Sequence, residues 1–140
     1  MKQVYVAGPF RDRNSGPDGR YNFYQQERYI RSAEAVAWQL WKQGFSVICP
    51  HLNTAPFQGS LPDDVWLQGD LEQVRRSDFV VLAPGWEASS GTRNEMEFAF
   101  RHGIRVFVWD ADLDDAKEIT EDGTSMWNFL SGEIVHRKKK

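Results

Sequence analysis

Residues 77–100 read SDFVVLAPGWEASSGTRNEMEFAF, and this stretch decides the fold. The apolar run Phe79 to Ala83 is typical of a strand covered on both faces, as in a parallel sheet, and Pro84-Gly85 ends it. Small residues then lead from Ser89 into a helix that carries Glu95. A helix N-terminus has free backbone N–H groups and a positive dipole end. The stretch therefore predicts an anion site with a carboxylate one turn away.

Two interpretations of Glu95 are open from these residues. In the first, Thr92 caps the helix and Glu95 bonds back to the Thr92 N–H, a capping box that stabilises a helix by about 1 kcal/mol. In the second, Glu95 is a reactive group beside a bound anion. The choice between them depends on what the rest of the chain places nearby.

The remainder of the chain alternates strands with helices, with no repeat and no linker. Further strands are expected at 2–7, 45–49 and 104–109, and further helices at 22–43 and 61–76. We expect Leu40 and Trp41 in the core of the first helix and Leu67 in the buried stripe of the second. This order predicts an α/β fold: a single-domain, doubly wound (Rossmann or flavodoxin-like) parallel sheet of about four to five strands, flanked by helices.

Composition limits the function classes. The chain has 140 residues, 41% of them hydrophobic, and a net charge of −3, so we expect one domain over residues 1–136 and a basic tail over 137–140. The negative charge argues against a nucleic acid polymer and favours a small substrate. No apolar run could span a bilayer, no signal-peptide pattern opens the chain, and the lone Cys49 fits a reducing compartment. We therefore expect a cytoplasmic protein with no membrane partner.

An acidic segment follows the last predicted strand. Its carboxylates match several positions of a calcium loop, but Asp115 stands where that loop requires glycine. We expect a solvated acidic loop over 110–122 and a short amphipathic piece over 125–130. No metal site is predicted.

The first and third strands of such a sheet are commonly neighbours, so their carboxyl ends should meet. That would bring Gly8, Phe10 and Arg11 to the loop before Glu95, with Asp70 of the adjoining helix beside it. Trp66 and Trp86 are available to stack a flat ring, although each is also typical of core packing. An anion site beside two carboxylates and aromatic rings is typical of a nucleotide site.

Several segments in order resemble the nucleoside 2-deoxyribosyltransferase superfamily. They are VYVAGPF at 4–10, FSVICP at 45–50, RRSDFVVLAPGW at 75–86 and SSGTRNEMEFA at 89–99. The resemblance implies that Glu95, in the motif G-x-x-x-E, attacks the anomeric carbon of a sugar and displaces the base. It also implies that Asp70 manages the proton of the leaving base and that Tyr5 orients the nucleophile. A carboxylate suits this step because it stabilises the positive charge that develops on the sugar.

Within that superfamily, the residue six positions before the nucleophile separates nucleoside users from nucleotide users. Nucleoside users resemble one another in having an aspartate there, whereas this chain has Ser89, and Ser89-Ser90-Gly91 with Arg11 is similar to members that hydrolyse nucleoside 5′-monophosphates. A serine, backbone N–H groups and a guanidinium would hold a phosphate that an aspartate would repel. The resemblance further implies a homodimer in which the second subunit supplies a serine to the pocket, here Ser125. It implies no cofactor and no metal.

The leading hypothesis is therefore an N-glycosidase acting on a ribo- or deoxyribonucleoside 5′-monophosphate. Base exchange by a nucleoside 2′-deoxyribosyltransferase is the alternative within the superfamily. The cytokinin-activating phosphoribohydrolases share part of the glycine and glutamate motif but differ in spacing. A non-catalytic nucleotide sensor is the alternative from another class.

Overall fold

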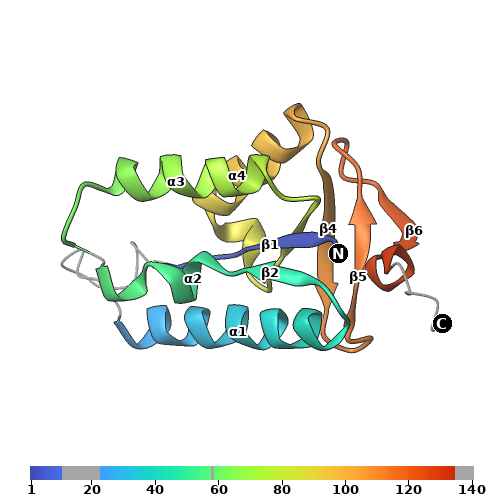
Figure 1. The fold of residues 1–140 in the computed structure, drawn as a ribbon, viewed down its shortest axis with the longest axis horizontal. Coiled ribbons are helices and arrows are strands. Elements are labelled where there is room, and N and C mark those ends of the chain that lie inside the picture. Colours follow the sequence, from blue (N-terminus) through green and yellow to red (C-terminus); the bar gives the residue numbers. More distant parts are fainter. Residues whose placement is uncertain (11–22, 58, 135–140) are drawn as a thin grey trace.

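The computed structural model describes residues 1–10, 23–57 and 59–134, with Met126 described by its backbone alone. Four strands alternate with helices, and two more strands follow (Figure 1). The strands are β1 (Gln3–Ala7), β2 (Ser46–Ile48), β3 (Phe79–Leu82), β4 (Arg105–Asp110), β5 (Asp115–Ile119) and β6 (Ser125–Phe129). The helices are α1 (Phe23–Lys42), α2 (Pro50–Asn53), α3 (Asp63–Arg75) and α4 (Ser90–Arg101), with 3-10 turns η1 (Ala55–Phe57), η2 (Trp86–Ala88) and η3 (Leu130–Glu133).

The six strands form one sheet in the order β2-β1-β3-β4-β5-β6. The first four are parallel, and β1 pairs with both β2 and β3, with Tyr5 opposite Ile48 on one side and Val80 on the other. The predicted doubly wound fold is confirmed, including the adjacency of the first and third strands. Because the chain reverses direction of winding between β1 and β3, their carboxyl ends form the point where such sheets place ligands.

Helices cover both faces of the sheet, as Figure 1 shows with α1 on one side and α3 and α4 on the other. Alternate residues of β1 serve the two layers: Val4 and Val6 pack with α1, whereas Tyr5 and Ala7 pack with α3 and α4. This alternation follows from the two-residue period of a strand. It places the Tyr5 side chain in the layer that carries Asp70 and Glu95.

The carboxyl-terminal third departs from expectation. Residues 115–119 were expected to be part of a solvated acidic loop and instead form β5, antiparallel to β4, and the expected amphipathic piece forms β6. The acidic strand is tolerated because Ala116 faces the core and Glu118, 8% exposed, accepts two hydrogen bonds from Arg105 at 2.8 Å each. The ion pair between Arg105 of β4 and Glu118 of β5 thus takes the place of water around this carboxylate.

Two helix residues expected in the core are exposed. Trp41 is 51% exposed because Val36, Ala37 and Leu40 fill the inward face of α1 and leave Trp41 at its edge. Leu67 is also 51% exposed, and Val74 is the buried residue of α3. No helix among the described residues is long and apolar enough to cross a membrane.

Candidate active site

Three predicted catalytic residues meet on one face of the sheet. Tyr5 lies in the middle of β1 and is fully buried, Glu95 lies on α4, and Asp70 lies on α3. The Glu95 and Asp70 charges both act on the Tyr5 hydroxyl, and the Asp70 charge acts on Glu95. The sequence separates these side chains by up to ninety positions, and the sheet topology brings them within electrostatic reach of one another.

The start of α4 removes the capping-box interpretation of Glu95. Ser89, not Thr92, is the N-cap: its hydroxyl oxygen accepts the Thr92 N–H at 3.2 Å and the Thr92 hydroxyl at 2.8 Å. The helix therefore begins at Ser90, and Glu95 lies in its second turn, beyond the reach of the cap. Its carboxylate has no capping role here, contrary to the first of the two interpretations.

Burial sets the protonation of the two carboxyl groups. The pKa of Glu95 is raised to about 8, first by burial and further by the Asp70 charge, while the Tyr5 hydroxyl opposes the shift. Burial alone raises the pKa of Asp70 to about 6. Two carboxyl groups with raised pKa values in one region are typical of acid–base or nucleophilic chemistry.

The Tyr5 hydroxyl and the Glu95 carboxylate face each other without completing a hydrogen bond of standard geometry. Tyr5 Oη and Glu95 Oε2 are both enclosed, and neither has a hydrogen-bond partner among the described residues. Even so, the hydroxyl is near enough to favour ionised Glu95, and burial together with Glu95 raises the pKa of Tyr5 well above its ordinary value. Unsatisfied polar atoms that are enclosed in a site are candidates for contacts with a bound molecule.

The N-terminus of α4 faces the same end of the sheet. The first intrahelical bond there is Arg93 N–H to Ser89 O at 3.0 Å, so helical geometry leaves the Ser90 and Gly91 N–H groups without an intrahelical acceptor. The Ser89 hydroxyl accepts from Thr92 and keeps its own proton to donate. Together with the helix dipole, these donors suit an anion.

The carboxyl end of β1 is held by a residue that the sequence did not reveal. His51, at the start of α2, is 5% exposed, and its Nε2 lies 3.1 Å from Gly8 O and 2.9 Å from Pro9 O. Burial lowers the pKa of His51, so the neutral ring donates its Nε2 proton to these carbonyls. Its partners are backbone oxygens more than forty positions away, which leave no motif. The buried, hydrogen-bonded position of His51 therefore could not be predicted from the sequence.

Gly8 is required by close packing at this point. A Cβ built on Gly8 would lie 2.9 Å from the Ala83 Cβ, closer than side chains pack. Phe10, two residues on, is half-buried and contacts the His51 ring edge to face with centroids 5.6 Å apart. The end of β1 is thus fixed against both β3 and α2.

Both predicted tryptophans present enclosed indole N–H groups. Trp66 stacks on Phe57 at 6.4 Å and shares a face of α3 with Asp70, four residues on. Trp86 packs into the layer that contains Tyr5. Neither Nε1 has an acceptor among the described residues, so each is a donor available to a ligand.

One further predicted site residue, Ser125, is not brought to this cluster. Arg11 lies outside the described residues. Ser125 begins β6 and pairs with Ile119, which in turn pairs with Val106 near the start of β4. Ser125 therefore lies toward the opposite end of the sheet from Glu95, three strands away from β3. Among the described residues, no group of three His, Cys, Asp or Glu side chains could hold a metal ion.

These features define a doubly wound α/β protein with a carboxylate pair and a helix N-terminus at the switch point of its sheet. The chain belongs to the family described as DUF1937, a domain of unknown function, whose model matches residues 2–111. A similar solved structure is that of a 2-deoxyribosyltransferase from the psychrotolerant bacterium Bacillus psychrosaccharolyticus. It shares 21% identity at a TM-score of 0.53, over 76% of this chain and 70% of that one, and this likeness shows a common fold. No curated protein matches the sequence.

Proposed function

We propose that this protein hydrolyses the N-glycosidic bond of a ribo- or deoxyribonucleoside 5′-monophosphate, releasing the free base and a sugar 5-phosphate. The observation that carries the proposal is the enclosed Glu95 carboxylate beside Tyr5 and Asp70, in the second turn of α4 after the Ser89 cap. The distinction between nucleotide and nucleoside rests on Ser89 and on the resemblance described above. The likeness to a 2-deoxyribosyltransferase supports chemistry at the same bond.

The first step forms a glycosyl ester. Ionised Glu95 attacks C1′ of the sugar, the C1′–N bond breaks, and its electron pair leaves with the base. Asp70, whose pKa is raised to about 6, donates the proton that neutralises the leaving base. The Tyr5 hydroxyl favours the ionised form of Glu95 and so orients the nucleophile for attack.

The second step releases the sugar. A water molecule attacks C1′ on the face that the base has left, its proton passes to the Asp70 carboxylate, and the ester bond to Glu95 breaks with its electrons returning to the carboxylate. Two inversions give overall retention at C1′. Asp70 is then protonated again for the next cycle.

The N-terminus of α4 is the proposed phosphate site. The Ser90 and Gly91 N–H groups and the Ser89 hydroxyl supply neutral donors, and Arg11 is the proposed cation. Trp66, Trp86 and Phe10 are the proposed contacts of the base, with Gly8 giving the close approach of β1. Ser125 belongs to the proposed homodimer, because only a neighbouring chain would bring it to this end of the sheet.

The decisive experiment is a panel of nucleoside 5′-monophosphates and nucleosides assayed for released base by chromatography. We expect release from at least one monophosphate, loss of that release in Glu95→Gln by a factor of about a thousand or more, and retained binding of the monophosphate by this variant. Glu97→Gln, an exposed glutamate on the same helix, is the matched control and should keep full activity.

Two other outcomes would indicate a different function or a different substrate. Binding of a monophosphate with no release of base by the folded wild-type protein would contradict hydrolysis and favour the nucleotide sensor. Release from free nucleosides but not from monophosphates would contradict the role of Ser89.

Base exchange is a second candidate, favoured by the fold shared with a 2-deoxyribosyltransferase. The first step would be the same, and a second base instead of water would accept the sugar from Glu95. Incubation of a substrate with an isotopically labelled second base separates the two, because transfer produces a labelled nucleoside or nucleotide and hydrolysis does not.

A further inference from the structure

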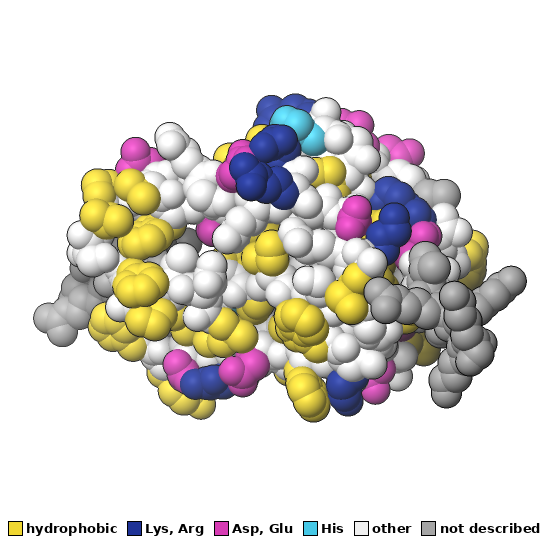
Figure 2. Space-filling model, viewed as in Figure 1, with side chains coloured by type: hydrophobic (Ala, Val, Ile, Leu, Met, Phe, Trp, Pro, Cys, Tyr) yellow, Lys and Arg dark blue, Asp and Glu magenta, His cyan; other side chains and the backbone are white. Residues whose placement is uncertain are grey.

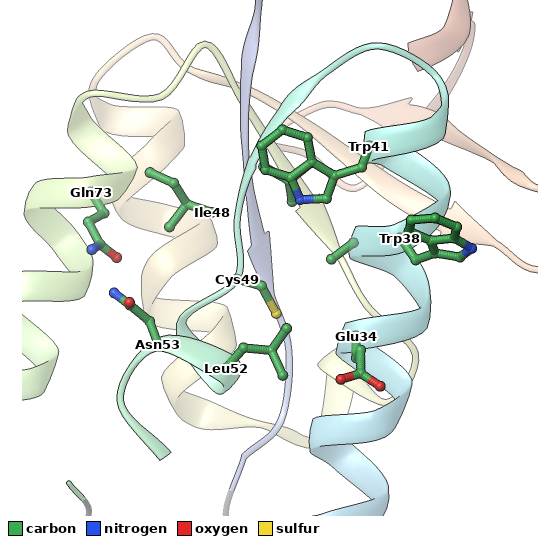
Figure 3. Close-up of a pocket in the computed structure, with 10 residues that line it drawn as sticks. Glu34, Trp38, Trp41, Ile48, Cys49, Leu52, Asn53 and Gln73 are labelled. Atoms are coloured by element: carbon green, nitrogen blue, oxygen red, sulfur yellow. The ribbon is translucent and has the colours of Figure 1, made fainter. Parts of the chain in front are cut away.

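A hollow of about 440 Å³ lies along the free edge of the sheet. Figure 3 shows Trp38 and Trp41 of α1 on one side of β2, and Gln73 of α3 with Asn53 of α2 on the other. Ile48, Cys49 and Leu52 lie between them. None of the predicted site residues lines this hollow, which we call the β2 groove.

Large apolar side chains on the walls of the β2 groove are exposed. Trp38 is 62% exposed, Trp41 51% and Leu52 43%. Figure 2 shows hydrophobic side chains gathered on this face, along α1 and around α2. Exposed tryptophans in one patch are typical of protein interfaces, where they contribute much of the binding free energy.

The floor of the groove is an unpaired strand edge. β2 is the last strand of the sheet and pairs only with β1 among the described strands. The Ser46 N–H bonds to Lys2 O at 3.0 Å, so the N–H and C=O of the next residue, Val47, point away from β1. Two such strands related by a two-fold axis through Val47 could exchange both hydrogen bonds in an antiparallel pair.

Charges along α1 have the pattern that a self-complementary contact needs. Glu34 lies four residues before Trp38 and Lys42 four residues after it, so all three share one face of the helix. Two α1 helices packed antiparallel about Trp38 would place Glu34 of each opposite Lys42 of the other. Glu34 pairs with Arg31 in its own chain at 3.0 Å while remaining exposed, and Lys42 lies over the Trp38 ring at 5.7 Å.

We propose that the β2 groove is an interface with a second copy of this chain, in which β2 pairs with β2 and α1 packs on α1 across a two-fold axis. An isologous contact requires one patch to match itself, and the opposite charges on either side of Trp38 meet that requirement. A partner of single charge, such as an acidic peptide, would match only one end of the patch. Gln73 Oε1, enclosed and without a described partner, is an acceptor at the rim of the same groove.

This dimer is independent of the proposed reaction. It joins two sheets through their β2 edges, which leaves β6 at the outer edge of each subunit. Ser125 of the partner would therefore stay far from Glu95. Any contact that delivers Ser125 to the active site would be a separate interface.

The first test is the oligomeric state, measured by sedimentation equilibrium over a range of concentrations. We expect a dimer for the wild-type chain and a dissociation constant weakened about tenfold or more in Trp38→Glu. Arg101→Glu is the matched control, because Arg101 is exposed at the end of α4, on the other face of the sheet from α1, and should leave dimerisation unchanged. A monomeric wild-type chain at high micromolar concentration, or a larger effect of Arg101→Glu, would overturn the proposal.

The second test uses charge and does not disturb the core. Lys42→Glu and Glu34→Lys should each weaken the dimer, and the double variant should restore it, because the swapped charges again face each other across the two-fold axis. Circular dichroism checks that each variant is folded. Single variants that dimerise like the wild type, or a double variant weaker than both, would show that these charges do not meet in an interface between two copies.

Discussion

At the scale of single residues, Glu95 and Asp70 behave as one titrating pair. The pKa of Glu95 is raised to about 8 and that of Asp70 to about 6, and the charge of Asp70 contributes to the first shift. The proposed reaction needs one ionised carboxylate as nucleophile and one carboxylic acid as proton donor. The competent pair therefore holds one proton between them.

We expect a bell-shaped pH dependence of kcat/KM for base release. The rate should rise as the pair loses its first proton at about pH 6 and fall as it loses the second at about pH 8, because only the singly protonated pair includes the competent form with Glu95 ionised and Asp70 protonated. That form is the minor one of the two, since Glu95 has the higher pKa. Asp70→Asn should be slower and should lose the alkaline decline. A wild-type profile that is flat between pH 5 and pH 9 would contradict the shared proton.

The same burial predicts that Glu95 reduces the stability of the folded protein at alkaline pH. Its folded pKa of about 8 lies above the ordinary value of 4.5, so between these values the unfolded chain releases a proton that the folded chain keeps. The contribution of Glu95 to the free energy of unfolding has its full value below pH 4.5, and it is lost as the pH rises to about 8. Glu95→Gln should thus be more stable than wild type at pH 8, by on the order of a few kcal/mol, and nearly equal at pH 4.

Chemical denaturation at both pH values measures this difference. Glu97→Gln on the exposed side of α4 should change neither value, which separates burial from a general effect of charge. Equal stability of wild type and Glu95→Gln at both pH values would mean that Glu95 is not enclosed in solution.

At the scale of elements, the start of α4 shows how one residue can cap a helix and still have a proton to donate. Ser89 caps α4 through its oxygen and retains a proton to donate. It occupies the position at which nucleoside users of the superfamily that the sequence resembles have aspartate. Aspartate also caps helices well. A change at this position can therefore alter the charge offered to a phosphate without shortening the helix.

Ser89→Asp is expected to leave the thermal midpoint within a degree or two of wild type and to lower kcat/KM for monophosphates about tenfold or more, because a carboxylate repels the phosphate dianion. Activity on free nucleosides should rise relative to monophosphates. Ser89→Asn, a neutral cap of the same shape, should keep the preference for monophosphates. If Asn reduces monophosphate turnover as much as Asp does, charge at this position does not select the substrate.

Elements with strong periodicity were predictable from the sequence, and those decided by distant contacts were not. The apolar runs at β1, β3 and β4 and the stripe of α1 located the parallel sheet, and its topology placed Tyr5, Asp70 and Glu95 together, although their roles stay predictions. One interpretation placed the N-cap of α4 at Thr92 instead of Ser89, because both residue types cap helices and the sequence offers both. His51 was missed because its partners are the backbone carbonyl oxygens of Gly8 and Pro9, just after β1.

At the scale of the whole molecule, the sheet has two parts. The family model ends at residue 111, just after β4, so the doubly wound part lies within it and the β5–β6 hairpin lies beyond. Arg105 on β4 joins them: it donates to Glu118 on β5 and pairs with Glu133 of η3 at 2.7 Å. The carboxylate of Glu118 also accepts from Asn128 of β6 at 3.0 Å.

Arg105→Met tests whether this junction holds the hairpin. Methionine keeps much of the packing of the Arg105 side chain, which lies over the Phe107 ring at 5.3 Å, but leaves the Glu118 carboxylate buried without its cation. We expect a loss of about 1–3 kcal/mol in unfolding free energy, measured by urea denaturation. Glu118→Gln in the same chain should recover part of that loss, because it removes the unpaired charge.

Activity measurements on Arg105→Met distinguish a structural role of Arg105 from a catalytic one. Arg105 begins β4, opposite Phe79 at the start of β3, whereas Gly8 and the cap of α4 lie at the carboxyl ends of β1 and β3. Arg105→Met should therefore keep the wild-type kcat/KM at temperatures well below its midpoint, while hydrogen exchange of the β5 and β6 amides accelerates before that of β1 and β3. Loss of activity in a fully folded variant, or uniform exchange across the sheet, would mean that the hairpin and the doubly wound part form a single cooperative unit.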